Sequence, residues 1–286
     1  MTDKTLQALH PALRDDIGDL VTRRPVPGPR VEQVDPFLFL NHHGPQTYPA
    51  NNHGLPFGPH PHRGFETVTF ILEGDLAHHD SAGHESIIRA GGVQWMTAGS
   101  GLVHAEVSPD DFKRRGGPLE LLQLWVNLPG RLKMSPPRYV GLQQDEIPAW
   151  RTPDGLTTVH LTSGSWDGHT GPVTSLTGVS LATVDLRPGG RVRFADLGDR
   201  SVFLYVVRGQ VEIGGTPAPA FNLVQLSDAG DAVEIASATG GLVLFGHAAP
   251  IGEPVVAHGP FVMNTREEIV QAITDYNAGK FDAAVG

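Results

Sequence analysis

Residues 58–74 read GPHPHRGFETVTFILEG, and residues 193–209 read RFADLGDRSVFLYVVRG. The two runs align without a gap, and each ends in an apolar stretch, a charged residue and a glycine. An internal repeat of this kind predicts two copies of one β unit. We therefore expect an N-terminal domain over residues 1–147 and a C-terminal domain over residues 148–286. The segment that joins them is rich in Pro, Gly, Asp and Thr.

Strand-like segments recur along the chain and are separated by turn residues. The 286 residues include 35 glycines and 24 prolines, and only 18% are charged. Short apolar strands between frequent turns favour two all-β domains built as sandwiches or barrels. The clearest expected strands cover residues 66–72, 92–96, 119–127, 181–186, 201–207 and 241–246.

A helix is expected near the C-terminus, at about residues 265–278. Thr265 and Glu268 fit a capping box, and Gly279 is a suitable stop. We expect the apolar stripe of this helix to pack on a domain surface. Its members follow helical spacing and are Ile269, Ala272, Ile273 and Tyr276.

Two short pairs of polar residues carry the functional signal. His60 and His62 form the first pair, and His104 and Glu106 form the second. Residues i and i+2 of a strand point to the same face, so each pair can direct two ligands at one point. Three imidazoles and a carboxylate suit a divalent transition metal such as iron. The pairs therefore predict a metal centre inside a barrel.

The identity of the carboxylate stays open on spacing alone. Glu66 lies four residues after His62, so on one regular strand it would share the face of that histidine. Glu66 can therefore replace Glu106 as the fourth ligand, or it can orient an imidazole from behind.

The second copy of the repeat has lost these side chains. In the gapless alignment, the positions of His60, His62 and Glu66 are occupied by residues that do not form a metal site, and we expect the C-terminal domain to be metal-free. These residues are Ala195, Leu197 and Ser201.

Six further histidines are expected to be exposed. His78, His79 and His84 flank a polar turn, and the others lie in a Gly-, Pro- and Asn-rich loop. Those in the loop are His42, His43 and His53.

Composition limits the partners of the chain. The formal charge is −10, from 21 basic and 31 acidic side chains. An acidic surface repels phosphate backbones, so we expect no direct nucleic-acid partner. The notable basic cluster at residues 113–115 is expected in a solvated loop. The absence of cysteine excludes disulfides, thiolate ligands and cysteine nucleophiles. Without a secretory signal or an apolar span, the expected location is the cytoplasm, away from membranes.

Four long motifs closely resemble the pirin family, a branch of the cupin superfamily. They are HPHRGFETVTF at 60–70, GVQWMTAGSGLVHAE at 92–106, LQLWVNLP at 122–129 and GPFVMNTREEIVQAI at 259–273. The resemblance implies two cupin-type β-barrels packed face to face, with a C-terminal helix. It also implies one metal in the N-terminal barrel, usually assigned as Fe(II), although the same donors would hold Mn, Ni, Cu or Zn.

The resemblance also implies a ligand set and an activity. The family ligands fall on His60, His62, His104 and Glu106, which favours Glu106 over Glu66. The activity implied is that of a quercetin 2,3-dioxygenase, with a flavonol and O₂ as substrates and Glu106 or Glu66 as the proton acceptor. The alternative is an iron-containing, redox-sensing regulatory protein that binds a transcription factor or a metabolic enzyme.

Overall fold

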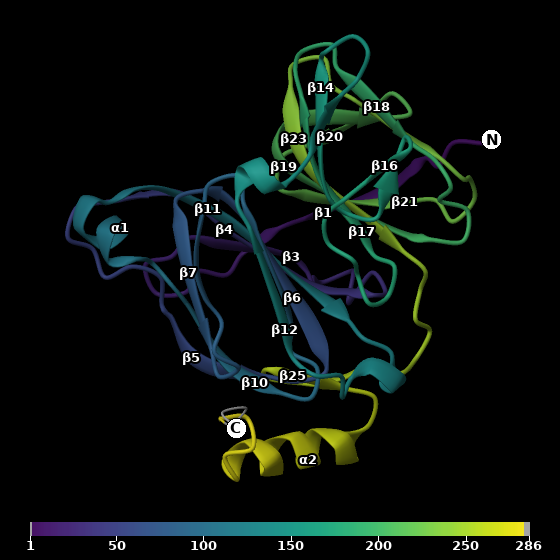
Figure 1. The fold of residues 1–286 in the computed structure, drawn as a ribbon. Helices are drawn as coiled ribbons and strands as arrows, with labels where there is room; N and C mark the ends of the chain where they lie inside the picture. The colour runs from purple at the N-terminus through teal and green to yellow at the C-terminus, as the bar shows by residue number, and fades with distance from the viewer. Residues whose placement is uncertain (1, 283–286) are drawn as a thin grey trace. The chain divides into compact units, whose positions relative to one another are not determined.

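A computed structural model describes residues 2–282 (Figure 1). The chain forms two compact units, each of them a β-barrel of the cupin type. The unit that we call the first barrel contains residues 14–23, 37–145 and 251–282. The second barrel contains residues 2–13, 24–36 and 146–250.

Both ends of the chain are exchanged between the two units. The chain crosses from one unit to the other at residues 145 and 146. In addition, residues 2–13 and 24–36 belong to the second barrel, and residues 251–282 belong to the first. A simple division at 147 and 148 does not include this exchange. Its physical basis is strand pairing at the N-terminus, where Leu9 lies opposite Val224, and apolar packing at the C-terminus.

The first barrel is built on two main sheets. One has seven strands in the order β12-β9-β6-β11-β4-β3-β2, and the other has four in the order β5-β10-β7-β8. The seven are β2 (Leu13–Arg14), β3 (Thr22–Val26), β4 (Phe37–Tyr48), β6 (Phe65–Glu73), β9 (Val93–Thr97), β11 (Gly117–Asn127) and β12 (Arg138–Leu142). The four are β5 (Phe57–His62), β7 (Asp75–Asp80), β8 (Glu85–Arg89) and β10 (Leu102–Val107).

The second barrel is built around one large sheet. Its main path runs β1-β21-β19-β23-β17-β14-β13, and β18, β20 and β22 pair off this path. These strands are β1 (Leu6–Pro11), β13 (Ala149–Arg151), β14 (Thr157–Ser163), β17 (Ser180–Leu186), β18 (Arg191–Phe194), β19 (Ser201–Ile213), β20 (Thr216–Pro219), β21 (Asn222–Leu226), β22 (Val233–Ala236) and β23 (Gly241–Ala248). A short ribbon pairs β15 (Ser165–Trp166) with β16 (His169–Thr170).

The internal repeat is visible in the strand order. In the first barrel β9, β6, β11 and β4 are consecutive neighbours, and in the second barrel β21, β19, β23 and β17 follow the same order. The strand that carries His60 and His62 pairs with β10, and its counterpart β18 pairs with β22. The counterparts Ala195 and Leu197 lie after β18 rather than within it. All six strands expected from sequence are present, with ends that differ by a few residues at most except in β19, which extends to Ile213.

The interior of the second barrel is filled with apolar side chains. Its core includes Val192, Phe194 and Leu197 from the region that corresponds to the metal pair, all at most 4% exposed. Leu197, the counterpart of His62, therefore packs in an apolar core.

The C-terminal segment packs within the first barrel. It contains β24 (Val256–His258), β25 (Phe261–Met263) and α2 (Arg266–Asn277), which Figure 1 shows next to β25. Thr265 caps α2, and the capping box with Glu268 is complete, as expected from sequence. Ile269 and Ala272 of α2 are buried in one cluster with Phe281 and residues of β25.

The basic cluster at 113–115 was wrongly expected in a loop. It forms the last turn of α1 (Asp110–Arg115), where the cations lie near the negative end of the helix dipole. Lys113 and Arg114 pair with acidic residues of the same helix, and Arg115 pairs with Asp75. Between residues 2 and 282, the other helical turns are two 3₁₀ segments, Gly130–Leu132 and Gln144–Glu146. Among the described residues, no helix is both long and apolar enough to span a bilayer.

Candidate metal centre

Three histidines meet on two neighbouring strands of the first barrel. β5 and β10 are antiparallel, and His104 lies directly opposite His60, with Leu102 opposite His62. One ring nitrogen from each of His60, His62 and His104 lies within 4.8 Å of the other two. The predicted convergence of the three imidazoles is therefore present in the structure.

Local backbone irregularities aim these side chains. The β5–β10 register shifts between His104 and Glu106, so one extra residue is accommodated on the β5 side. After His62 the chain turns at Gly64, whose φ of +91° is one that L-residues rarely adopt. A Cβ atom at Gly64 would lie 2.0 Å from the carbonyl oxygen of Val262. Glycine is thus required at the turn that ends the ligand strand.

Glu106 lies beside the histidines but is not part of the 4.8 Å group. His104 and Glu106 register regularly against β7, so both side chains point to the same face of β10. Thr69 donates a hydrogen bond of 2.9 Å to Oε1 of Glu106, and Gln123 donates to Oε2. The carboxylate is therefore buried and held by two donors at the edge of the histidine group.

Glu66 occupies a different environment. The turn at Gly64 separates His62 on β5 from Glu66 on β6, so the two do not share one regular strand and the spacing argument for a common face was wrong. β6 registers against β9 without a bulge from residue 66 to 70. Because Thr69 reaches Glu106 and side chains alternate, Glu66 points to the opposite face of β6. There it accepts a 2.6 Å hydrogen bond from Thr97.

The hydrogen bonds of the histidines fit a metal ion. His60 and His62 each use Nδ1, the first toward the carbonyl of Gly58 at 2.8 Å and the second toward that of Pro260 at 3.2 Å. A ring that donates through Nδ1 presents an Nε2 lone pair. His104 is 1% exposed, and neither of its ring nitrogens has a hydrogen-bond partner. A buried imidazole without partners is costly unless an ion or other group satisfies it, so these residues fit a bound metal.

The electrostatics favour neutral imidazoles. Burial, with a contribution from the charge of His60, lowers the pKa of His62 to about 3. Burial and the neighbouring imidazoles also lower the pKa of His104 well below its ordinary value. Burial raises the pKa of Glu106, although His78 and the two hydrogen-bond donors oppose this shift. Neutral imidazoles are the form that binds metals.

Aromatic rings surround one side of the group. The ring centroid of Trp125 lies 5.4 Å from that of His62 and 4.4 Å from that of Phe65. Phe39 stacks on Trp125 with a centroid distance of 4.7 Å. These rings give the histidine site an apolar wall.

Three histidines that were expected to be exposed are buried. His42 lies 2.8 Å from Oε1 of Glu120, and His43 lies 2.9 Å from the hydroxyl of Thr22. Both were placed in a loop from composition, but they belong to β4, where each ring has a polar partner.

His78 is a further buried histidine and lies next to the metal group. Its Nε2 atom lies 3.0 Å from Asp80, and its ring stacks on Tyr139 at 4.1 Å. In the antiparallel pairing of β7 with β10, His78 lies opposite Glu106. Its ring centroid is 5.5 Å from that of His104. Alternation with buried Leu76 could have indicated this inward position. His79 and His53 are exposed, as expected.

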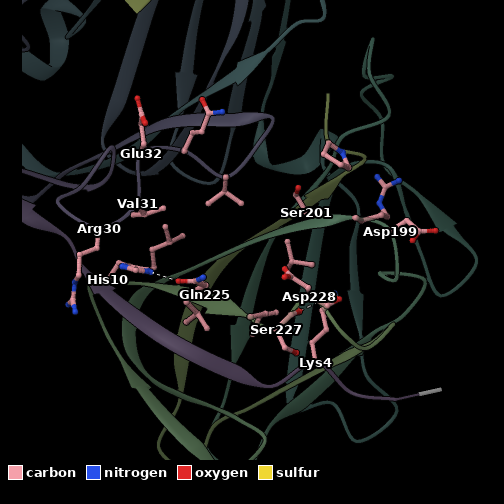
Figure 2. A pocket seen from close by; sticks show the side chains of 18 of the residues that line it. Lys4, His10, Arg30, Val31, Glu32, Asp199, Ser201, Gln225, Ser227 and Asp228 are labelled. Carbon is pink, nitrogen blue, oxygen red and sulfur yellow. Dashed lines mark hydrogen bonds between the residues drawn. The ribbon is translucent and has the colours of Figure 1, made fainter. Parts of the chain in front are cut away.

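A separate cavity of about 740 Å³ lies in the second barrel (Figure 2). Lys4 is buried in its wall and donates to the backbone carbonyls of Ser227 and Asp228. His10 forms a 2.9 Å hydrogen bond with Gln225. Lys4 and His10 therefore both have hydrogen-bond partners within the protein. Within residues 2–282, the histidine group of the first barrel alone meets the distance required of three metal donors.

The fold and the site together define a class. The chain is a two-domain cupin-type protein with a three-histidine site in one barrel and an apolar core in the other. Residues 19–126 match the Pirin family model, and residues 181–282 match the Pirin C-terminal cupin domain. The chain belongs to the pirin family.

Relatives and a solved structure agree with this assignment. The chain is 42% identical over 255 residues to a pirin-like protein of Caulobacter vibrioides, covering 88% of this chain and 90% of the relative. It is 36% identical over 250 residues to a Pseudomonas aeruginosa protein named "Putative quercetin 2,3-dioxygenase", covering 87% of each. The crystal structure of quercetin 2,3-dioxygenase from Acinetobacter baumannii superposes with a TM-score of 0.90 at 30% identity, covering 98% of this chain and 99% of that one.

Proposed function

We propose that this protein is a metal-dependent dioxygenase that opens the heterocycle of flavonols such as quercetin. The observation that carries the proposal is the convergence of His60, His62 and His104 within 4.8 Å inside one barrel. The similarity in sequence and fold to proteins named as quercetin dioxygenases supports the choice of substrate class.

We propose Fe(II) as the metal, held by the three imidazoles with Glu106 as the fourth ligand. The support for Glu106 is its position on the same face of β10 as His104. A bound divalent transition metal supplies Lewis acidity toward substrate oxygens and exchange of electrons with O₂. Three or four protein ligands leave positions open for a substrate.

The proposed acid–base role falls to the same carboxylate. Burial raises the pKa of Glu106, which makes it a better proton acceptor for a flavonol hydroxyl than an exposed glutamate. Thr69 and Gln123 hold its two oxygens and thereby fix its orientation. The part-buried Trp125 offers an apolar surface beside His62 for a flat aromatic ring. Glu66 bonds to Thr97 on the other face of β6, which supports Glu106 rather than Glu66 in this role.

The proposal is tested by loading the purified protein anaerobically with Fe(II) and adding flavonols. O₂ uptake should match the loss of flavonol absorbance in the iron-loaded wild type, and it should be abolished in His104→Ala. A matched control is His247→Ala, which removes a part-buried histidine of the second barrel. Iron-loaded protein that consumes no O₂ with any flavonol would contradict the proposal.

A second candidate is a redox-sensing regulatory protein that binds a transcription factor or metabolic enzyme. It is favoured by the 42% identical relative, whose name carries no enzymatic activity, and by a net charge of −10 that suits a basic protein partner. Affinity capture with the Fe(II) and Fe(III) forms tests it. Recovery of the same proteins in both states would argue against a redox-dependent partner.

A further inference from the structure

The C-terminal segment is bonded to the strand that carries two of the metal-binding histidines. The carbonyl of Pro260 accepts the hydrogen bond from Nδ1 of His62 at 3.2 Å. Next to it, the N–H of Val262 donates to the carbonyl of Arg63 at 3.1 Å. Residues 260–262 therefore pair with the end of β5, where the orientation of His62 is set.

Arg63 connects three parts of the first barrel through one buried guanidinium. Nη1 donates to Asp275 of α2 at 2.8 Å, and Nε donates to the carbonyl of Ser100 at 2.7 Å. The guanidinium also lies 4.6 Å from the ring centroid of Phe281. Ser100 belongs to the turn that leads into β10 and His104. One side chain thus joins both ligand-bearing segments to the C-terminal helix.

Lys133 also connects the turn after His62 to the C-terminal segment. Its ammonium group is 1% exposed and donates to the carbonyls of Gly64 and Val262 at 2.9 and 3.0 Å. The third hydrogen bond goes to Asn127 at 2.7 Å. All three donors of the ammonium group are used, so the group has no capacity left for a substrate. Its contacts fix the turn after His62 against β25.

Asp275 is itself held in place. Gln271 and Lys280 each donate to its Oδ1 atom at 2.8 Å, which leaves Oδ2 for Arg63. The carboxylate is buried, and these cationic partners, Lys280 and Arg63, keep its pKa well below the ordinary value.

We propose that residues 256–281, the C-terminal latch, position the metal centre. Through Pro260 and the Arg63–Asp275 pair, the latch fixes the tautomer and the direction of His62 and holds the turn before His104. Loss of a group that orients a metal-binding histidine typically weakens metal affinity by about 10- to 100-fold. The inference rests on the metal site of the proposed function but not on the dioxygenase activity.

The test measures Co(II) binding by the full-length protein, with Asp275→Asn as the main variant. The dissociation constant is obtained by competition with a chromophoric chelator, and the visible spectrum of bound Co(II) reports ligand geometry. We expect Asp275→Asn to bind Co(II) about 10- to 100-fold more weakly than the wild type, with an altered spectrum. The matched control is Thr265→Ala, which weakens the cap of α2 without touching Arg63.

Arg63→Lys provides a second variant if Asp275→Asn does not fold. It keeps the cation for Asp275, but the compact ammonium group cannot span Asp275 and Ser100 as the guanidinium does, so we expect an intermediate loss of affinity. Wild-type affinity and spectrum in the folded variants would overturn the inference. Co(II) binding that is sensitive to the latch in a protein without dioxygenase activity would contradict only the proposed function. A wild type that binds no Co(II) would overturn both.

Discussion

His62 is held by a hydrogen bond at one nitrogen of its ring. Nδ1 bonds to a carbonyl 198 residues further along the chain, which leaves Nε2 as the nitrogen available to a metal. His104 has no such partner at either nitrogen, so its orientation depends on the strand and on whatever it binds. The three rings therefore differ in how firmly the protein holds them, although they offer the same donor atom.

A pair of glutamine substitutions separates the two carboxylates. Glu106→Gln should lower the affinity for a divalent metal by at least about tenfold, because it removes the anionic donor on the face of His104. Glu66→Gln should leave metal content unchanged, since its side chain bonds to Thr97 on the other face of β6. Elemental analysis after dialysis against a weak chelator measures both. Metal loss in Glu66→Gln alone would reverse the assignment.

The lowered pKa values predict acid sensitivity of the metal-free protein. Between the folded-state pKa of His62, about 3, and its ordinary value of 6.5, the unfolded chain binds a proton that the folded chain excludes. Stability therefore falls as the pH drops below 6.5, by up to about 1.4 kcal/mol per pH unit for each such histidine. The raised pKa values of Glu66 and Glu106 act in the opposite direction.

The contribution of one histidine is isolated by comparison with His104→Asn. Urea unfolding of both metal-free proteins at several pH values between 7.5 and 4.5 gives two slopes. The wild-type free energy of unfolding should decrease more steeply toward acid than that of His104→Asn. Parallel slopes would mean that His104 takes up protons equally in the folded and unfolded chains.

At the scale of the elements, strand alternation explains both the success and the failure of the sequence-based predictions. His60 and His62 share a face because β5 is regular where they lie, so their convergence could be predicted from spacing. The face of Glu66 could not, because the direction of a side chain after a turn depends on the turn at Gly64. His78 was missed because composition, rather than alternation with Leu76, was used to place it.

The turn at Gly64 can be tested with alanine. Gly64→Ala should reduce the free energy of unfolding by roughly 2 to 5 kcal/mol, combining the cost of a positive φ with displacement of Val262. Gly178→Ala is the control, since it has a positive φ of +67° and nothing within 4 Å of the added Cβ. It should cost only about 1–2 kcal/mol. Equal losses in thermal or urea unfolding would show that the contact with Val262 is unimportant.

At the scale of the whole molecule, the repeat predicted two similar barrels but not the exchange of the chain ends. The repeat is a local pattern, and it survives in the matching strand orders of the two barrels. The pairing of β1 with β21 and the packing of α2 depend on contacts between residues far apart in sequence. Such pairings leave no periodic signal in either partner, which is why a division at 147 and 148 was the natural expectation.

Removal of the last segment tests how much the first barrel depends on it. A chain that ends at residue 250 lacks Pro260, Asp275 and the apolar cluster around α2. We expect the second barrel to remain folded, because its residues are all present, and the first to lose metal binding and unfold at a lower temperature. Calorimetry should resolve two unfolding transitions. Only the transition of the first barrel should move to a lower temperature than in the full-length protein. An unchanged thermogram would contradict the expectation.

The position of the latch in the sequence also affects when the metal site can be completed during synthesis. His60, His62 and His104 leave the ribosome early, but Asp275 follows His62 by 213 residues. At about 5–20 residues per second, the histidines wait roughly 10–40 s for the segment that orients them. During that interval the nascent chain would hold three histidines without the contacts that orient His62. Firm binding of the metal would therefore follow the synthesis of residue 275.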